Sequence, residues 1–404
     1  MCITEERTVS RNPHRRTSVL LLVAALVQPL ALVAAPRLAP LAASAADDAQ
    51  RGLITRFAAL GMRNAVATYA RYPALGMAML PYTEFLLTRS TLPPRHRELL
   101  WLRTAWLARS DYLWAQRAPA ARRAGVSEAE LERIALGPDA AGWDAFEAAL
   151  LRAADELHVD AFVSDATWAT LAARYDANQL TDLLYGVGEI EMHATFASTL
   201  RIEIEPELKD RLPSGIAYAP AARQTNARLV GKAARIEPLP PTGSGFGNAN
   251  VFRTFARNPP ADELRNAVGK HVRDETSLTP RNREELIMRV GVLCRSEYEW
   301  AAHSRVGRQV GLNDGDVARV IAGASSPGGN ALESALLRAA DELYRDDVVG
   351  DATWDALARE LSERQLLDSL FTFGAFRSAT YAINSAGVQL DANMSELRFP
   401  PELR

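Results

Sequence analysis

Cysteine is nearly absent from this chain of 404 residues, which contains only Cys2 and Cys294. If an N-terminal leader is removed, Cys294 remains alone and no intrachain disulfide can form. Its apolar surroundings favour a small core residue over a reactive thiol, because buried free cysteine is common. The protein is therefore not expected to depend on disulfides.

An excess of one charge is also lacking, since 46 basic and 49 acidic residues give a formal net charge of -3. This charge balance gives no reason to expect a basic surface, so a nucleic-acid partner is not predicted. Apolar residues make up 48% of the chain and charged residues 24%, as in ordinary soluble globular proteins. Strand-like alternation bounded by turn signals is missing as well, which predicts an all-α fold.

The first 45 residues are predicted to be a signal peptide or N-terminal leader. Arg15 and Arg16 precede an apolar run over residues 19–35, and Ala43–Ala45 has the small-x-small pattern that signal peptidases cut. The arrangement is compatible with a twin-arginine signal. It predicts an exported, periplasmic or secreted protein with no stable membrane span after leader cleavage. The alternatives are a membrane anchor, or a misplaced start site and a cytoplasmic protein.

The rest of the chain is an internal repeat. Leu150–Leu157 and Leu336–Leu343 are both LLRAADEL, and Asp165–Trp168 recurs as Asp351–Trp354. Both pairs are displaced by 186 residues. The same displacement relates Asn64 to Asn250, Glu98 to Glu284, Arg103 to Arg289 and Ser110 to Ser296. Because the offset is constant, the two copies align without a gap. The chain is therefore a tandem duplication.

The repeat sets the predicted domain organisation. A first copy extends over residues 53–205, a linker over 206–247 and a second copy over 248–390. The linker is rich in Pro, Gly, Ser and Ala, which is typical of loops. Each copy is predicted to consist of helices with short joints, because capping residues, glycines and prolines punctuate helical patterns.

Protonatable groups are concentrated in Glu284–Gly311 of the second copy. This stretch predicts two helices that meet at a turn, the second opened by Ser296. Ser296 and Glu299 have the S-x-x-E spacing of a capping box. Glu299 and His303 are four residues apart, so both project from one helix face.

These stretches resemble the carboxymuconolactone decarboxylase family, which includes the alkylhydroperoxidase D-like proteins. The resemblance rests on LTPRNRE at Leu278–Glu284 and EYEWAAH at Glu297–His303, with LPPRHRE at Leu92–Glu98 and DYLWAQR at Asp111–Arg117 in the first copy. It covers both copies. It implies two tandem alkylhydroperoxidase D-like helical domains and a trimer-like homo-oligomer.

One activity of the family is disfavoured by the residues present. The peroxidase branch uses Glu…Cys-x-x-Cys-x-x-x-His, with thiols activated at a helix N-terminus. The two thiol positions are Ser296 and Glu299 in the second copy, and Ser110 and Leu113 in the first. A hydroxyl group cannot cycle through a disulfide, so alkylhydroperoxidase-like peroxide detoxification is disfavoured.

The acid–base half of the family pattern is retained at Glu284 and His303, and Glu299 replaces the second thiol. The resemblance implies a cofactor-free lyase or proton-transfer enzyme that acts on a small carboxylated or lactone metabolite. His303 is then the expected proton donor and Glu284 its partner or base. Glu299 is expected to orient the imidazole and raise its pKa.

Four further residues are expected to bind the substrate. Arg289 or Arg377 would hold a substrate carboxylate through a bidentate contact. Ser296 and Tyr298 complete the predicted binding residues. No cofactor is expected, because such a decarboxylation needs only charge stabilisation and a proton delivered to carbon.

Each assignment has a plainer alternative. Ser296 and Glu299 can form a capping box only, Glu299 and His303 an ordinary surface pair, and Glu284 a helix-dipole contact. Tyr298 can be a core residue. Two glutamates and one histidine can ligate a metal, but no further histidine lies nearby, so no metal is predicted. The alternative function is a non-catalytic helical ligand-binding or assembly module.

The two copies are not equivalent. The first copy has Arg117 and Leu113 where the second has its histidine and second glutamate. Pro119 falls inside the same predicted helix, where proline costs about 3 kcal/mol or causes a kink. His193 lies on another predicted helix and does not restore the imidazole. The first copy is therefore predicted to be a degenerate, structural domain.

Overall fold

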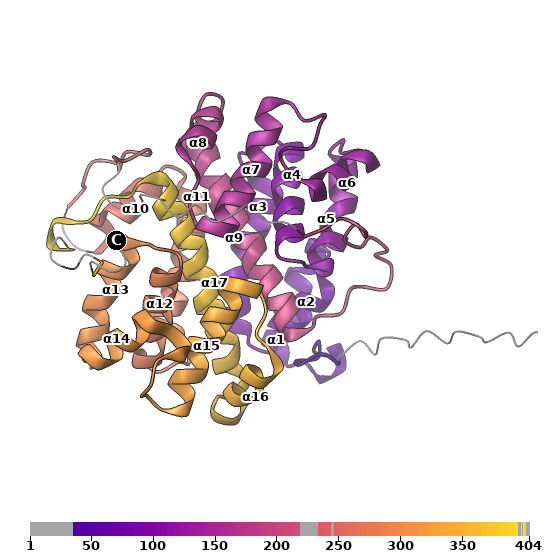
Figure 1. The fold of residues 1–404 in the computed structure, drawn as a ribbon. Coiled ribbons are helices and arrows are strands. Elements are labelled where there is room, and N and C mark those ends of the chain that lie inside the picture. Colours follow the sequence, from indigo (N-terminus) through magenta and orange to yellow (C-terminus); the bar gives the residue numbers. More distant parts are fainter. Residues whose placement is uncertain (1–34, 219–232, 244–245, 395–396, 398, 401–404) are drawn as a thin grey trace, which may run out of the picture. The chain divides into compact units, whose positions relative to one another are not determined.

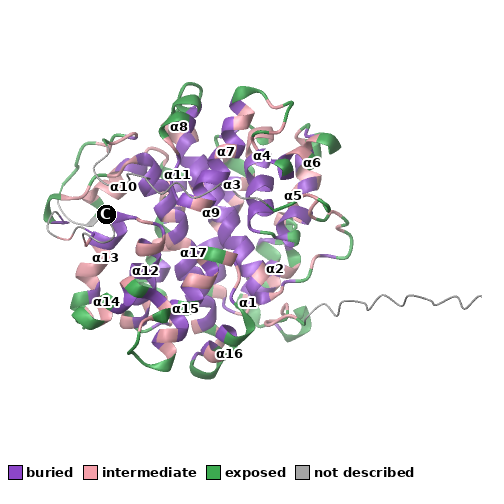
Figure 2. Cartoon of the chain, in the orientation of Figure 1, coloured by how far each residue is buried: buried purple, intermediate pink, exposed green. Residues whose placement is uncertain are grey.

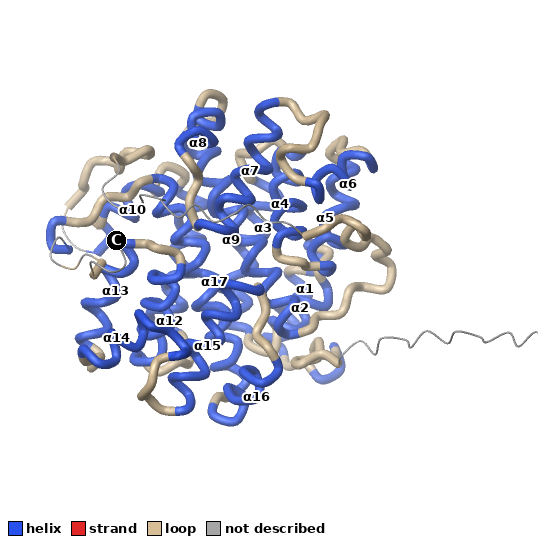
Figure 3. The backbone as a smooth tube through the Cα atoms, viewed as in Figure 1, coloured by secondary structure: helices blue, strands red, loops and turns tan. Residues whose placement is uncertain are grey.

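The structure, a computed structural model, describes residues 35–218, 233–243, 246–394, 397 and 399–400. These residues form helices and loops without a β-strand, which confirms the all-α prediction (Figure 3). The chain divides into a unit over residues 1–35 and a second unit over residues 36–404. The predicted leader lies outside the described residues up to position 34. Among the described helices, none combines the length and hydropathy that a membrane-crossing segment needs.

The helices follow the repeat (Figure 1). The first copy has α1 (Asp48–Arg56), α2 (Arg63–Tyr69), α3 (Pro73–Arg89), α4 (Pro94–Leu107), α5 (Asp111–Arg123), α6 (Glu128–Leu136), α7 (Ala145–Asp160), α8 (Asp165–Ala172) and α9 (Ala177–Leu200). The second copy has α10 (Asn250–Phe255), α11 (Pro259–Lys270), α12 (Pro280–Leu293), α13 (Glu297–Gln309), α14 (Asp314–Ala322), α15 (Ala331–Asp346), α16 (Asp351–Glu360) and α17 (Glu363–Ala386). From α3 onward each helix of the first copy begins 186 residues before its counterpart.

Local signals explain most helix ends. Pro280 occupies the first turn of α12, where its missing N–H is no loss. Asn313 caps α14, and Ser362 forms a capping box with Gln365 at the start of α17, as predicted. Gly387 ends α17 in the left-handed conformation that favours glycine. These contacts are local, so the sequence pattern alone locates them.

The two longest helices, α9 and α17, pack against each other between the copies (Figure 1). A Cβ atom on Gly188 would lie 2.2 Å from Ser378 Oγ, and one on Gly374 would lie 2.5 Å from Met192 Cγ. These residues are equivalent in pairs, so the contact is reciprocal, as in an interface with a two-fold axis. Most residues of both helices are buried (Figure 2).

Two arginines that are not related to each other by the offset of 186 residues hold the copies together. Arg37 donates to the carbonyl oxygens of Thr199 and Val349, at 3.0 and 2.7 Å, and pairs with Asp351 at 2.6 Å. Arg235 contacts the equivalent positions of the other copy, which are Ser385, Val163 and Asp165. The folded part therefore includes residues of the ranges that the sequence assigned to the leader and the linker.

Candidate acid–base site

The imidazole of His303 lies between two carboxylates. Helix α12 provides Glu284, and α13, which packs against it, provides Glu299 and His303. His303 Nδ1 is 2.7 Å from Glu284 Oε2, and its Nε2 is 3.4 Å from Glu299 Oε2. The structure thus brings together the three residues predicted to be catalytic.

The cluster is largely buried and its imidazole is the most accessible member. The side chains of Glu284 and Glu299 are 2% and 8% exposed, whereas that of His303 is 20% exposed. Glu299 and His303 are therefore not the ordinary surface pair that the sequence left open as an alternative. Of the three side chains, the imidazole is therefore the one most exposed to solvent.

The environment moves the pKa values of the two carboxylates in opposite directions. Burial raises the pKa of Glu299, and the charge of His303 only partly opposes this. Burial also acts to raise the pKa of Glu284, but the hydrogen bond and charge of His303 and nearby Arg283 outweigh it and lower the pKa. Burial acts to lower the pKa of His303, yet both carboxylates raise it overall.

Two neighbours of the site were missed by the sequence analysis. Arg283 Nε donates to Glu284 Oε1 at 2.8 Å. The ring of Phe376, from α17, packs edge-to-face against His303 with centroids 4.9 Å apart. Arg283 precedes Glu284 in the LTPRNRE stretch, so its position was a usable signal. Phe376 had no such signal, because α17 is distant in sequence.

The capping box predicted at Ser296 is wrong. Ser296 occupies the N-cap of α13, but its side chain makes no capping hydrogen bond. Its Oγ is buried and has no hydrogen-bond partner within the described ranges. The Glu299 carboxylate contacts His303 instead, with Oε2 3.4 Å from Nε2. In the first copy, by contrast, Ser110 caps α5 by accepting from Leu113 N at 3.4 Å.

Arg289 was expected to contact the substrate, but its guanidinium is engaged by other residues of the second copy. Its Nε donates to Asp341 Oδ1 at 2.6 Å, and its Nη1 donates to carbonyl groups in the last turn of α14 at 3.0 and 2.8 Å. Arg103 makes the same contacts with Asp155 and the end of α6. A contact present in both copies is best explained by helix packing.

Tyr298 also has a structural contact that the first copy repeats. Its hydroxyl donates to Asp391 Oδ2 at 2.6 Å, and Tyr112 donates to Glu205 at 3.1 Å. Each pair ties the chain after the last helix of its copy to the helix that begins near the tyrosine. Tyr298 is itself buried, which agrees with the alternative of a core residue.

Arg377 lies at the junction between the copies and is only 2% exposed. Its Nη2 is 2.7 Å from Glu191 and its Nη1 is 2.6 Å from Asp347. Glu191 and Arg377 are equivalent positions, so the duplication has placed opposite charges at one pair of related sites. The guanidinium is engaged by protein carboxylates, which gives it a structural role in place of the predicted substrate contact.

His158, Glu191 and Asp347 are the described residues whose spacing is suitable for a metal ion, with ligand atoms within 4.8 Å of one another. His158 Nδ1 lies 2.6 Å from Glu191 Oε1. However, the guanidinium of Arg377 contacts both carboxylates. It already offsets their charge, so this group is better explained as a buried ion-pair network.

The first copy has a different arrangement at the equivalent place. Arg117 Nε donates to Glu98 Oε2 at 3.0 Å. A guanidinium does not release its proton in proteins, so this pair cannot exchange protons as Glu284 and His303 can. Helix α5 continues past Pro119 to Arg123. His193 belongs to a separate buried group, where it contacts Tyr69 at 3.1 Å and Thr83 at 2.9 Å.

Comparison with known proteins identifies the domain type. The model of the Carboxymuconolactone decarboxylase family matches the chain twice, over residues 73–156 and 259–342. Both matches begin at the first residue of equivalent helices, α3 and α11. A search of curated proteins and of solved structures found no match.

Proposed function

Starting from two tandem domains of the carboxymuconolactone decarboxylase family, we propose that the second is a cofactor-free acid–base catalyst. It would act as a carboxy-lyase, or a related proton-transfer enzyme, on a small carboxylated or lactone metabolite. One observation supports this most strongly: two buried carboxylates, with pKa values moved apart, flank a partly exposed imidazole. Environments that separate pKa values in this way distinguish an acid from a base.

The contact between Glu284 and His303 fixes the state of the imidazole. Glu284, with its lowered pKa, is the ionised partner that accepts from Nδ1 at 2.7 Å. Nε2 is then the nitrogen that gains and loses a proton. The raised pKa of His303 keeps this nitrogen protonated over more of the neutral range, which suits a proton donor.

The proposed chemical step is loss of carbon dioxide followed by proton delivery. The bond between the substrate carbon and its carboxylate breaks, and the electron pair remains on the conjugated lactone. Protonated His303 donates its Nε2 proton to carbon and becomes neutral. Glu299, 3.4 Å from Nε2 and with a raised pKa, is positioned to return a proton to the imidazole.

Two further groups support substrate binding near the cluster. Arg283 places a guanidinium beside the cluster, where its Nε donates to Glu284. Ser296 has a buried hydroxyl with no partner among the described residues, at the N-terminus of the helix that contains Glu299. A buried unpaired hydroxyl is costly unless a ligand uses it. Substrate binding therefore remains our proposal for Ser296.

The test is turnover of a carboxylated muconolactone, followed against pH, for the wild-type protein and for His303→Gln. We expect the substitution to reduce kcat by about 10²- to 10⁴-fold and to abolish the pH dependence that the imidazole imposes. His193→Gln, which changes a buried histidine of the first copy, is the matched control. Unchanged turnover in His303→Gln would exclude the proposal and favour the non-catalytic binding module.

A further inference from the structure

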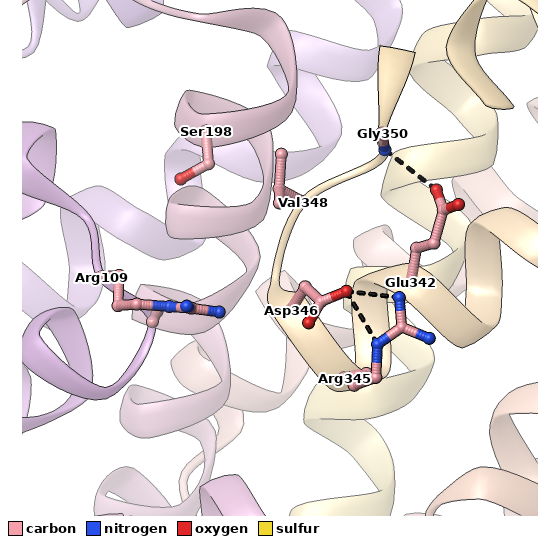
Figure 4. Close-up of a pocket in the computed structure, with 8 residues that line it drawn as sticks. Arg109, Ser198, Glu342, Arg345, Asp346, Val348 and Gly350 are labelled. Carbon is pink, nitrogen blue, oxygen red and sulfur yellow. Dashed lines mark hydrogen bonds and ion pairs between the residues drawn. The ribbon is translucent and has the colours of Figure 1, made fainter. Parts of the chain in front are cut away.

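A cavity of about 450 Å³ opens at the junction between the copies, apart from the residues assigned to acid–base chemistry. The first copy contributes Ala108 and Arg109, from the turn between α4 and α5, and Ser198 from α9. The second copy contributes the end of α15 and the loop that follows it, including Val348 and Gly350 (Figure 4). The volume lies within the range of small-molecule sites, about 300–1,000 Å³.

The duplication supplies a reference for this cavity, because each lining residue has an equivalent on the other side of the junction. The four uncharged lining residues are all smaller than their equivalents. Ala108, Ser198, Val348 and Gly350 correspond to Cys294, Asn384, Phe162 and Ser164. The uncharged part of the wall thus has less side-chain volume on this side of the junction than on the other.

The contacts of Asn384 show what fills the other side. Its Nδ2 donates to the carbonyl oxygens of Ala161 at 3.1 Å and Cys294 at 3.0 Å. The shorter side chain of Ser198 does not make these two contacts. Since protein interiors are normally close-packed, a cavity open on one side of a repeated interface needs an explanation.

Arg109 provides the charge that is available to a ligand. Its guanidinium extends from its turn toward the loop of Val348 (Figure 4) and stacks on the Tyr218 ring, 5.0 Å from the centroid. No carboxylate pairs with it among the described residues.

The other charged groups of the wall are already engaged. Arg345 Nε donates to Asp346 at 2.8 Å. Glu342 accepts from Gly350 N at 2.9 Å and from Thr353 Oγ1 at 2.7 Å, so both of its oxygens hold the start of α16.

We propose that this cavity is a binding site for a small organic carboxylate. The carboxylate would pair with the Arg109 guanidinium, and the Ser198 hydroxyl would donate a hydrogen bond to it. Ala108 and Val348 would contact the apolar part of the ligand. The site is separate from the proposed catalytic cluster and does not depend on its activity.

Calorimetric titration with benzoate tests the proposal, with benzamide as the uncharged isostere and inorganic phosphate as another anion. We expect saturable benzoate binding that weakens by about tenfold or more in Arg109→Gln. Ser198→Asn and Val348→Phe introduce the side chains of the filled side and should abolish binding. Circular dichroism would verify that each variant is folded.

Two controls separate this site from others. Arg295→Gln changes the equivalent arginine beside the filled side and should leave benzoate affinity unchanged, as should His303→Gln. Equal loss in Arg109→Gln and Arg295→Gln, or full binding in Ser198→Asn and Val348→Phe, would overturn the site. Absence of benzoate binding, or equal affinity for benzamide or phosphate, would overturn the carboxylate assignment.

Discussion

The same two helix positions form a guanidinium–carboxylate pair in the first copy and an imidazole–carboxylate pair in the second. Glu98 is held by Arg117, with Nε to Oε2 at 3.0 Å, whereas Glu284 is held by His303 at 2.7 Å. Both pairs satisfy a buried carboxylate, so both support the fold. Of the two cations, only the imidazole belongs to a residue type that titrates near neutral pH. Together with Leu113 in place of Glu299, this difference separates the first copy from the candidate catalytic one on a shared scaffold.

The largest expected effect is on activity. Glu284→Gln should reduce turnover by about 10²-fold or more, because the amide neither fixes the imidazole by charge nor raises its pKa. Glu98→Gln in the first copy should leave turnover within about twofold, since no proton-transfer group depends on it. Steady-state kinetics on a carboxylated muconolactone would compare them. Equal losses would show that the first copy is not a purely structural domain.

A second comparison concerns the arginine that both copies share. Arg103→Ala leaves Asp155 buried without its partner and should lower the free energy of unfolding by about 3–5 kcal/mol. Asp341 is 23% exposed, against 5% for Asp155, so Arg289→Ala should cost less. Denaturant titration of both variants measures the difference. A larger loss for Arg289→Ala would contradict this ranking.

The glycines between α9 and α17 offer a finer test of the reciprocal contact. A Cβ on Gly188 would meet the Ser378 backbone at 2.7 Å, whereas one on Gly374 meets only the flexible side chain of Met192. Gly188→Ala should therefore destabilise the protein by about 2 kcal/mol, and Gly374→Ala by less. Thermal unfolding distinguishes them, and an equal shift in Tm would argue against the packing described.

The smallest expected effect concerns a carboxylate that only the second copy has. Glu285 replaces the equivalent of Leu99, and burial and the charge of Glu333 raise its pKa to about 7. A raised carboxyl pKa means that folding is penalised once pH exceeds the unfolded value, and fully so above the folded one. Arg319 donates to Glu285 at 2.8 Å but also lies 3.0 Å from Glu333, so it keeps a carboxylate partner when Glu285 is replaced. Glu285→Leu should therefore stabilise the protein by about 1 kcal/mol at pH 8 and by less at pH 5. Equal changes in denaturant midpoint at both pH values would contradict this.

Much of the fold and the central trio could be predicted from sequence. The helices and their ends could be predicted because periodicity and caps such as Asn313 depend on residues close together in the chain. The duplication could be predicted because one constant offset of 186 residues relates the two copies. The spacing of Glu299 and His303 placed them on one helix face, and the resemblance added Glu284. The Ser296 cap failed although the spacing of Ser296 and Glu299 is right: the serine makes no capping hydrogen bond, and Glu299 pairs with His303 four residues further along the same helix. The contact of His303 with Phe376 depends on where α17 packs, which local spacing does not reveal.

By itself the sequence determined that this protein is a duplicated, all-helical chain, and it identified Glu284, Glu299 and His303 as the candidate trio of the second copy. Only the tertiary structure decided which polar groups are already paired. Arg377 is engaged by Glu191 and Asp347 at the junction, and the cavity beside Ser198 is open where Asn384 fills its equivalent. These features depend on contacts between residues far apart in the chain. Their energies are set by burial and geometry, which neither periodicity nor spacing encodes.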